Sequence, residues 1–183
     1  GPFWFWQRCG QICRDRLTLL VSRETTGRPL KMPMPWTYRH SSKEWRAILD
    51  DLKDRMDLVS DNSAYTALDA VLQVFRRRLT AQEGIDFASV LPSVPRAIFV
   101  AGWKVDNPPL PFADREALTL EAKQVRPHHN LTPSNAIEAT AWTLRRYVYA
   151  ADLERVLARL PQEAREFWHA HVSSPDELKQ RIF

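Results

Sequence analysis

Residues 64–99 read AYTALDAVLQVFRRRLTAQEGIDFASVLPSVPRAIF, and residues 133–168 read PSNAIEATAWTLRRYVYAADLERVLARLPQEAREFW. Aligned without a gap, at an offset of 69 residues, the two stretches are identical at eight of 36 positions. This similarity predicts a duplicated unit, and a repeat of this length constrains the architecture of the whole chain. The identical pairs are Ala67/Ala136, Ala70/Ala139, Arg76/Arg145, Arg77/Arg146, Ala81/Ala150, Leu91/Leu160, Pro92/Pro161 and Arg96/Arg165.

The apolar residues inside both stretches recur at the spacing of amphipathic helices, and no stretch shows the alternation of a strand. Pro92 and Pro161 are each expected to end a helix, because proline lacks the backbone donor that a helix needs. Arg96 and Arg165 follow these prolines by four residues and are expected to hold the same helix junction twice. We therefore predict an all-α fold of about eight or nine helices, with two tandem helical pseudo-repeats packed into one domain.

Capping residues and breakers set the expected helix ends. Gly102 is expected to close a helix in the left-handed conformation that glycine adopts without strain. Serine, threonine, asparagine and aspartate accept hydrogen bonds from the free N–H groups of a first helical turn. The expected N-terminal caps are Ser41, Asn62 or Ser63, Thr80, Asp114, Thr132 and Ser174.

The composition excludes several functional classes. The chain has five glycines, too few and too scattered for a phosphate-binding loop or a dinucleotide-binding turn. Both cysteines, Cys9 and Cys13, lie near the N-terminus, so neither a disulfide framework nor a thiolate metal site is expected in the rest of the chain.

The net charge of +4 comes entirely from residues 1–31, where six basic residues face two acidic ones. Residues 32–183 carry 20 basic and 20 acidic groups, so this part is formally neutral. Residues 3–6 of this segment are four consecutive aromatic residues. Gln7 and Arg8 interrupt this apolar run before it reaches the length of a signal-peptide core. We predict that 1–31 is an extension before an all-α domain at 32–183, with repeats at about 62–103 and 131–170. The alternative is a basic aromatic arm that lies on a surface.

Arginine is concentrated at one point of each stretch: Arg76, Arg77 and Arg78 in the first, and Arg145 with Arg146 in the second. A guanidinium offers a planar fork of donors that suits phosphates, so these residues are candidates for nucleic-acid contact. Cations near a helix C-terminus are also stabilised by the helix dipole and by neighbouring carboxylates. Because the body of the chain carries no net charge, we favour the structural interpretation.

The positions at which the two stretches differ are candidates for function. Trp142 aligns with the polar Gln73, so this face of the second stretch is expected to contact something. Tryptophan, tyrosine and arginine carry most of the binding energy at protein interfaces. The candidate interaction residues are Arg76, Arg77, Arg78, Trp142, Arg145, Arg146 and Tyr149.

Histidine spacing gives little support to a metal site. His128 and His129 are adjacent, and His169 and His171 are two residues apart, so neither pair has the helical i, i+4 spacing of a shared metal. The serines and threonines stand where helix caps are needed rather than beside a base and an orienting group. We expect no catalytic residue, no metal and no cofactor.

Two sets of motifs follow one another between Trp36 and His169. They are Leu91-Pro92, Arg96, Phe99 and Gly102-Trp103, and then Leu160-Pro161, Arg165, Phe167 and Trp168. This order resembles the bacterial domain of unknown function numbered 2267, in which a first Leu-Pro segment ends in Gly-Trp and a second in Leu-Trp or Phe-Trp. The resemblance implies a small all-α cytoplasmic protein without an assigned activity, and it supplies no catalytic residues.

Our hypothesis from the sequence is a non-catalytic helical module that binds a protein partner or a second copy of itself, in a stress-response or regulatory setting. The first alternative is nucleic-acid binding through Arg76/Arg77 and Arg145/Arg146. The second is a metal-dependent hydrolase around the adjacent histidines. We expect a cytoplasmic chain without a transmembrane segment.

Overall fold

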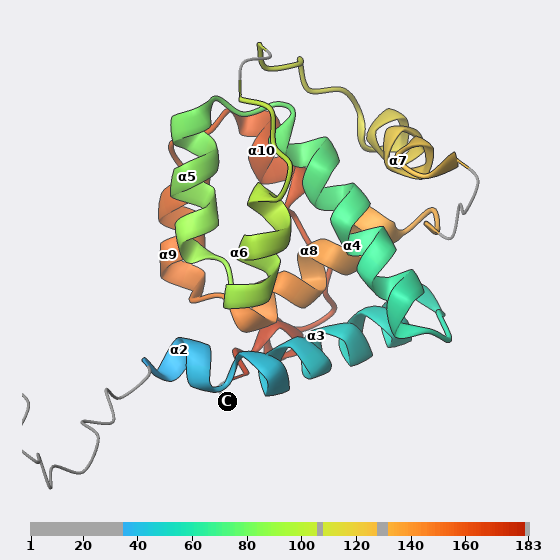
Figure 1. Cartoon of the computed structure of the whole chain (residues 1–183), viewed down its shortest axis with the longest axis vertical. Coiled ribbons are helices and arrows are strands. Elements are labelled where there is room, and N and C mark those ends of the chain that lie inside the picture. Colours follow the sequence, from blue (N-terminus) through green and yellow to red (C-terminus); the bar gives the residue numbers. More distant parts are fainter. Residues whose placement is uncertain (1–34, 106–107, 128–131, 182–183) are drawn as a thin grey trace, which may run out of the picture. The chain divides into compact units, whose positions relative to one another are not determined.

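The computed structural model of the chain describes residues 35–105, 108–127 and 132–181 (Figure 1). In these ranges the chain forms nine α-helices, one short 3-10 helix and no strand, which confirms the predicted all-α class. The elements are α2 (Trp36–Arg39), α3 (Ser41–Met56), α4 (Asp61–Arg76), α5 (Ala81–Val90), α6 (Ser93–Val100), α7 (Arg115–Gln124), α8 (Ala136–Tyr147), α9 (Ala150–Leu157), α10 (Gln162–Phe167) and η2 (Pro175–Leu178). The predicted N-terminal extension lies outside the described residues.

The two similar stretches pack into each other rather than side by side as separate units. The aligned helices α4 and α8 contact each other, and so do α5 and α9. Helix α3, which precedes the first stretch, packs on α8 of the second, whereas α7, which precedes the second, packs on α4 of the first (Figure 1). Each stretch therefore completes the core of the other, and neither is expected to fold alone.

Aromatic rings from both stretches meet at the centre of the core. Phe75 of α4 is fully buried, and its ring lies 4.8 Å from that of Phe87. The rings of Phe167 and Trp168 lie 5.1 and 5.2 Å from Phe75. These tilted and edge-to-face pairs are the arrangements that aromatic quadrupoles favour. The cluster joins α4 and α5 to the end of α10.

Three of the predicted caps are confirmed. Thr80 and Glu83 form a capping box at the start of α5, and Ser174 with Glu177 forms another at η2. The side chain of Asp114 accepts a 2.7 Å hydrogen bond from the backbone N–H of Ala117 at the start of α7. These residues satisfy N–H donors that have no carbonyl partner inside the helix.

Three other predicted caps were wrong. His40 rather than Ser41 stands at the N-cap of α3, because the short α2 precedes it and the Ser41 hydroxyl donates to the carbonyl of Tyr38. Ser60 rather than Asn62 or Ser63 caps α4, and it accepts the backbone N–H of Ser63 at 3.1 Å. The first turn of α8 starts later than predicted, and its N-cap is Asn135 instead of Thr132.

The two Leu-Pro breaks have the same local structure. Pro92 and Pro161 are the N-caps of α6 and α10, with φ/ψ of −55/158° and −53/155°. Arg96 Nε donates to the Ala88 carbonyl at 2.8 Å. Arg165 Nε donates to the carbonyl of Leu157, the residue aligned with Ala88, at 3.2 Å. Each arginine thus holds the end of one helix to the next, as the alignment predicts; the duplication itself stays a prediction.

Candidate functional site

A surface cavity opens where the connector from α6 to α7 passes over the C-terminus of α4. Its volume is about 870 Å³. We call it the Arg76 cavity. Its lining residues are Gln73, Arg76, Arg77, Leu79, Thr80, Ala81, Gly102, Trp103, Lys104, Val105, Pro108, Pro109 and Leu110. The connector is held there by a 2.8 Å hydrogen bond from the Leu110 backbone N–H to the carbonyl of Arg77.

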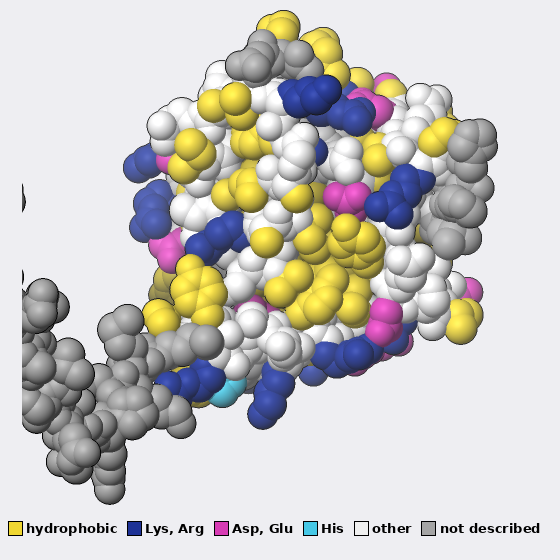
Figure 2. Space-filling view, in the orientation of Figure 1, with side chains coloured by type: hydrophobic (Ala, Val, Ile, Leu, Met, Phe, Trp, Pro, Cys, Tyr) yellow, Lys and Arg dark blue, Asp and Glu magenta, His cyan; other side chains and the backbone are white. Residues whose placement is uncertain are grey.

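The lining of the Arg76 cavity is basic and apolar. It contains Arg76, Arg77 and Lys104, and no described residue of the lining is an aspartate or a glutamate. In Figure 2, Lys and Arg side chains lie beside hydrophobic and acidic ones near the top of the view, where Figure 1 places the connector between α6 and α7. A cavity with this lining suits an anion attached to an apolar group.

Arg76 is the buried cation of this cavity, with only 7% of its surface exposed. Its Nη1 atom donates to the carbonyl oxygens of Phe99 and Ala101, at 2.6 and 2.8 Å. No carboxylate of the described residues forms an ion pair with it; Asp69 acts on it from a distance and itself pairs with Arg126. Burial lowers the pKa of the Arg76 guanidinium, so this charge is held in an environment that disfavours it.

The neighbouring arginines of the cluster are paired. Arg77 Nη1 and Arg78 Nη2 bind the two carboxylate oxygens of Glu121, at 2.9 and 2.5 Å. Burial opposes the charged form of Glu121, but the bonds from these arginines outweigh it and lower the pKa of the carboxyl group. Arg78 is buried, also donates to the carbonyl of Pro111, and does not line the cavity. Together they fasten α7 and the connector to α4.

Trp103 forms a wall of the Arg76 cavity because Gly84 leaves room for its ring. A Cβ atom built on Gly84 would lie 1.9 Å from the indole ring, so no other residue fits at this position without displacing it. Gly102 has the predicted left-handed conformation, with φ of 64°. This turn directs Trp103 back onto α5 and the ring of Phe99, 5.7 Å away.

The second arginine cluster lies apart from this cavity. Arg145 Nε donates to the carbonyl of Trp168 at 2.7 Å, and its Nη1 pairs with Glu154 at 2.6 Å. Arg146 pairs with Asp51 of α3 at 2.8 Å. Both side chains are therefore held by the protein's own groups, and neither lines the Arg76 cavity.

Trp142 lies in a smaller hollow between α3 and α8. Its ring is half-buried between the guanidinium groups of Arg55 and Arg146, at 3.9 and 4.4 Å from the ring centroid. The hollow has a volume of about 280 Å³. These cation–π contacts give Trp142 a structural role in joining α8 to α3. Tyr149, another candidate, is exposed at the N-cap of α9.

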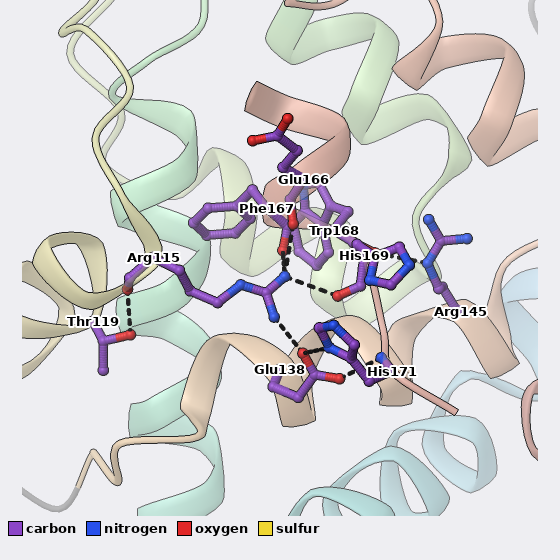
Figure 3. A network of polar contacts seen from close by, with 9 residues as sticks. All are labelled: Arg115, Thr119, Glu138, Arg145, Glu166, Phe167, Trp168, His169 and His171. Carbon is purple, nitrogen blue, oxygen red and sulfur yellow. Dashed lines mark hydrogen bonds and ion pairs between the residues drawn. The ribbon is translucent and has the colours of Figure 1, made fainter. Parts of the chain in front are cut away.

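Glu138 and Arg115 form the polar network that joins α7, α8 and the end of α10 (Figure 3). Arg115 donates to the carbonyl oxygens of Glu166, Phe167 and His169 at 2.7, 3.0 and 2.8 Å, and it pairs with Glu138. Burial opposes the charged form of Glu138, but hydrogen bonds from His171 and the charge of Arg115 lower the pKa of its carboxyl group overall.

The histidines form no recognisable reaction centre in the described part of the chain. His128 and His129, the centre of the hydrolase hypothesis, lie outside the described residues. The rings of His169 and His171 meet edge to face, with centroids 4.7 Å apart. The backbone N–H of His171 donates to Glu138, and both residues line the smaller hollow beside Trp142. Among the described residues no cluster of three or more His, Cys, Asp or Glu side chains has the arrangement of a metal site.

Sequence reasoning named Arg76 and Arg77 but missed the other walls of the Arg76 cavity. Trp103 and Lys104 come from the connector, and only its three-dimensional path brings them beside α4. One available signal was the alignment itself. Arg145 has an acidic partner in Glu154, whereas the residue aligned with Glu154 is Ile85, which points to an unpaired charge at Arg76.

The fold and the cavity thus define an all-α domain with a basic, apolar ligand-sized cavity. The chain belongs to the family described as uncharacterized conserved protein (DUF2267), which matches residues 45–167, about two thirds of the chain. This match confirms the resemblance drawn from the Leu-Pro and Trp motifs. No curated protein matches the chain. No helix in the described ranges has the length and apolar composition that a membrane crossing requires.

Proposed function

We propose that this chain is a non-catalytic helical module that binds an acidic segment of a partner protein in the Arg76 cavity. The proposal rests on the buried guanidinium of Arg76, which lines the cavity without an ion-pair partner among the described residues. Burying a charge without a counter-charge costs free energy. An anion from a bound partner would offset that cost, and a resting protein without one retains it.

The apolar part of the lining favours a protein segment over a small inorganic ion. Trp103 and Leu79 form part of the wall, and the connector adds Val105, Pro108 and Leu110. Val105 and Leu110 are more exposed than apolar residues of a core. Exposed apolar side chains gathered beside arginine and tryptophan are typical of protein-binding surfaces.

The contacts of the arginine clusters count against the nucleic-acid alternative. Arg77 and Arg78 are paired with Glu121, and Arg145 and Arg146 with their own acidic partners. Phosphate binding at these side chains would have to replace an existing ion pair at each position. The part of the chain at 32–183 is also formally neutral, so it provides little of the nonspecific attraction on which nucleic-acid affinity depends.

The test uses two blocked peptides, acetyl-Leu-Glu-Leu-amide and acetyl-Leu-Gln-Leu-amide, which differ by one charge. Isothermal calorimetry on the full chain should give a dissociation constant about tenfold lower for the glutamate peptide, equivalent to about 1.4 kcal/mol. Arg76→Met and Lys104→Met should each weaken binding of that peptide. Arg159→Met, which changes an exposed arginine outside the cavity, is the matched control and should leave the affinity unchanged.

Two cavity variants are used because Arg76→Met also removes two hydrogen bonds to backbone carbonyl groups. Lys104 is exposed, so Lys104→Met leaves those bonds in place. Circular dichroism of each variant shows whether its fold is retained. Equal binding of both peptides by the wild type contradicts the proposal. A second result would also contradict it: a short single-stranded oligonucleotide binds more tightly than either peptide, and its affinity falls steeply with salt. That result supports the nucleic-acid alternative.

A further inference from the structure

Arg76 and Arg145 occupy equivalent places in the two similar stretches. Arg76 Nη1 donates to the carbonyl of Phe99, 23 residues ahead, at 2.6 Å. Arg145 Nε donates to the carbonyl of Trp168, also 23 residues ahead, at 2.7 Å. In both cases the carbonyl lies at the end of the short helix that follows a Leu-Pro break. The two guanidinium groups therefore stabilise the same kind of helix end.

They differ in their counter-charge. Arg145 Nη1 pairs with Glu154 Oε1 at 2.6 Å, from one turn and a half into α9. The residue that stands nine positions after Arg76 is Ile85, an apolar side chain with 59% of its surface exposed on α5. An isoleucine side chain this exposed contributes little burial free energy to the fold. The first stretch therefore has no carboxylate at the position of Glu154. The cavity beside Arg76 is lined by Thr80 and Ala81 at the start of α5, and Ile85 follows them one turn later, outside the lining.

We infer that a carboxylate of the bound partner takes, at Arg76, the role that the internal carboxylate of Glu154 has at Arg145. This inference rests on the proposed function and names its anchoring group: an aspartate or glutamate side chain whose oxygen accepts a charge-assisted hydrogen bond from the guanidinium. The apolar residues beside that carboxylate lie against Trp103 and Leu79. Glu154 is thus an internal counterpart of the ligand group.

The inference predicts that the missing carboxylate can be supplied within the chain. Ile85→Glu places a glutamate at the spacing that Glu154 has from Arg145, and it should compete with the ligand. We expect this variant to bind acetyl-Leu-Glu-Leu-amide about tenfold more weakly than the wild type, with a higher midpoint of thermal unfolding. Ile85→Gln, nearly the same shape without the charge, should bind the peptide like the wild type. Val59→Glu adds the same charge at a fully exposed position outside the cavity and serves as the second control.

A second measurement keeps the test decisive if Ile85→Glu alters the fold. Carbon-detected NMR of the new glutamate should show a carboxyl pKa below the usual value of about 4.3, and Arg76→Met in the same background should return it to that value. An unshifted carboxyl pKa together with unchanged peptide affinity overturns the inference.

The outcomes separate the inference from the proposed function. If the wild type binds neither peptide, the proposed function fails with it. If the wild type prefers the glutamate peptide but Ile85→Glu binds it equally well, only the placement of the carboxylate is wrong. Inorganic phosphate that displaces the peptide at lower concentration than acetate would overturn the choice of a carboxylate as the anchoring group.

Discussion

The indole ring of Trp103 lies directly over Gly84, so close that a Cβ atom on that glycine would come within 1.9 Å of the ring. This contact joins the connector after α6 to α5 and forms one wall of the Arg76 cavity. It also explains why glycine stands inside a helix, where it is disfavoured by about 1 kcal/mol relative to alanine.

Gly84→Ala is therefore expected to destabilise the protein by about 1–3 kcal/mol, because the added methyl group must displace a packed ring. A double-mutant cycle with Trp103→Ala isolates the contact, since the methyl group has no ring to displace in that background. Unfolding of the wild type, the two single variants and the double variant in guanidinium chloride gives the coupling free energy between the two substitutions. Additive costs for the two substitutions would show that the ring does not press on Gly84.

Asp51 is the buried acceptor that joins three separate parts of the chain. Its carboxylate accepts hydrogen bonds from Arg146 and the Tyr147 hydroxyl, both at 2.8 Å, and from Arg181 at 3.0 Å. Asp51→Ala is expected to lower the free energy of unfolding by about 2–3 kcal/mol, because the buried hydroxyl of Tyr147 and the half-buried guanidinium of Arg146 lose their shared carboxylate. Asp54→Ala, on the exposed face of the same helix, should change it by less than about 0.5 kcal/mol. Equal changes in the free energy of unfolding for the two variants would show that Asp51 does not hold these parts of the chain together.

Glu138 gives the protein a predictable response to acid. Its pKa is lowered in the folded state by His171 and Arg115, despite the opposing effect of burial. A lowered pKa means that the folded state holds the charged carboxylate more firmly than the unfolded chain does. The carboxylate of Glu138 therefore contributes to the free energy of unfolding above the unfolded pKa of about 4.3. This contribution is lost as the pH falls through the folded pKa.

Glu138→Gln should therefore reduce the slope of unfolding free energy against pH below about pH 5, measured by urea unfolding at a series of pH values. Glu121 and Asp61, whose pKa values are also lowered, keep part of the slope in the variant. A slope identical to that of the wild type would mean that Glu138 does not gain its stabilising bonds in solution.

Local pattern was enough to predict most helices and the junctions between them. Pro92 and Pro161 begin helices at aligned positions, and Arg96 and Arg165 bind aligned carbonyls, because these features depend only on residues close in sequence. Gly102 likewise has the left-handed conformation expected of a helix-closing glycine. The caps were predicted less well. Several neighbouring residues suit a cap, such as Ser60, Asn62 and Ser63 before α4, and only the path of the preceding turn decides which one takes the position.

The Arg76 cavity depends on contacts that no local pattern contains. Trp103 reaches Gly84 across a turn, and the backbone of Leu110 returns to the carbonyl of Arg77. In the alignment of the two stretches, Arg76 and Arg145 are equivalent. The structure distinguishes them by their surroundings, because Arg145 pairs with Glu154 whereas Arg76 lines a cavity. The ring of Trp142 lies between two arginines of the same chain, which the sequence did not predict, and its role at an interface stays a prediction.

Arginine side-chain NMR observes directly whether the guanidinium of Arg76 meets the anion of a bound partner. In protein labelled with ¹⁵N, the Nε–Hε signal of Arg76, assigned by comparison with Arg76→Lys, is followed during titration with the two blocked peptides. We expect the glutamate peptide to shift this signal and the glutamine peptide to leave it in place. A glutamate peptide that binds the protein while the Arg76 signal stays unchanged would contradict the proposed role of Arg76.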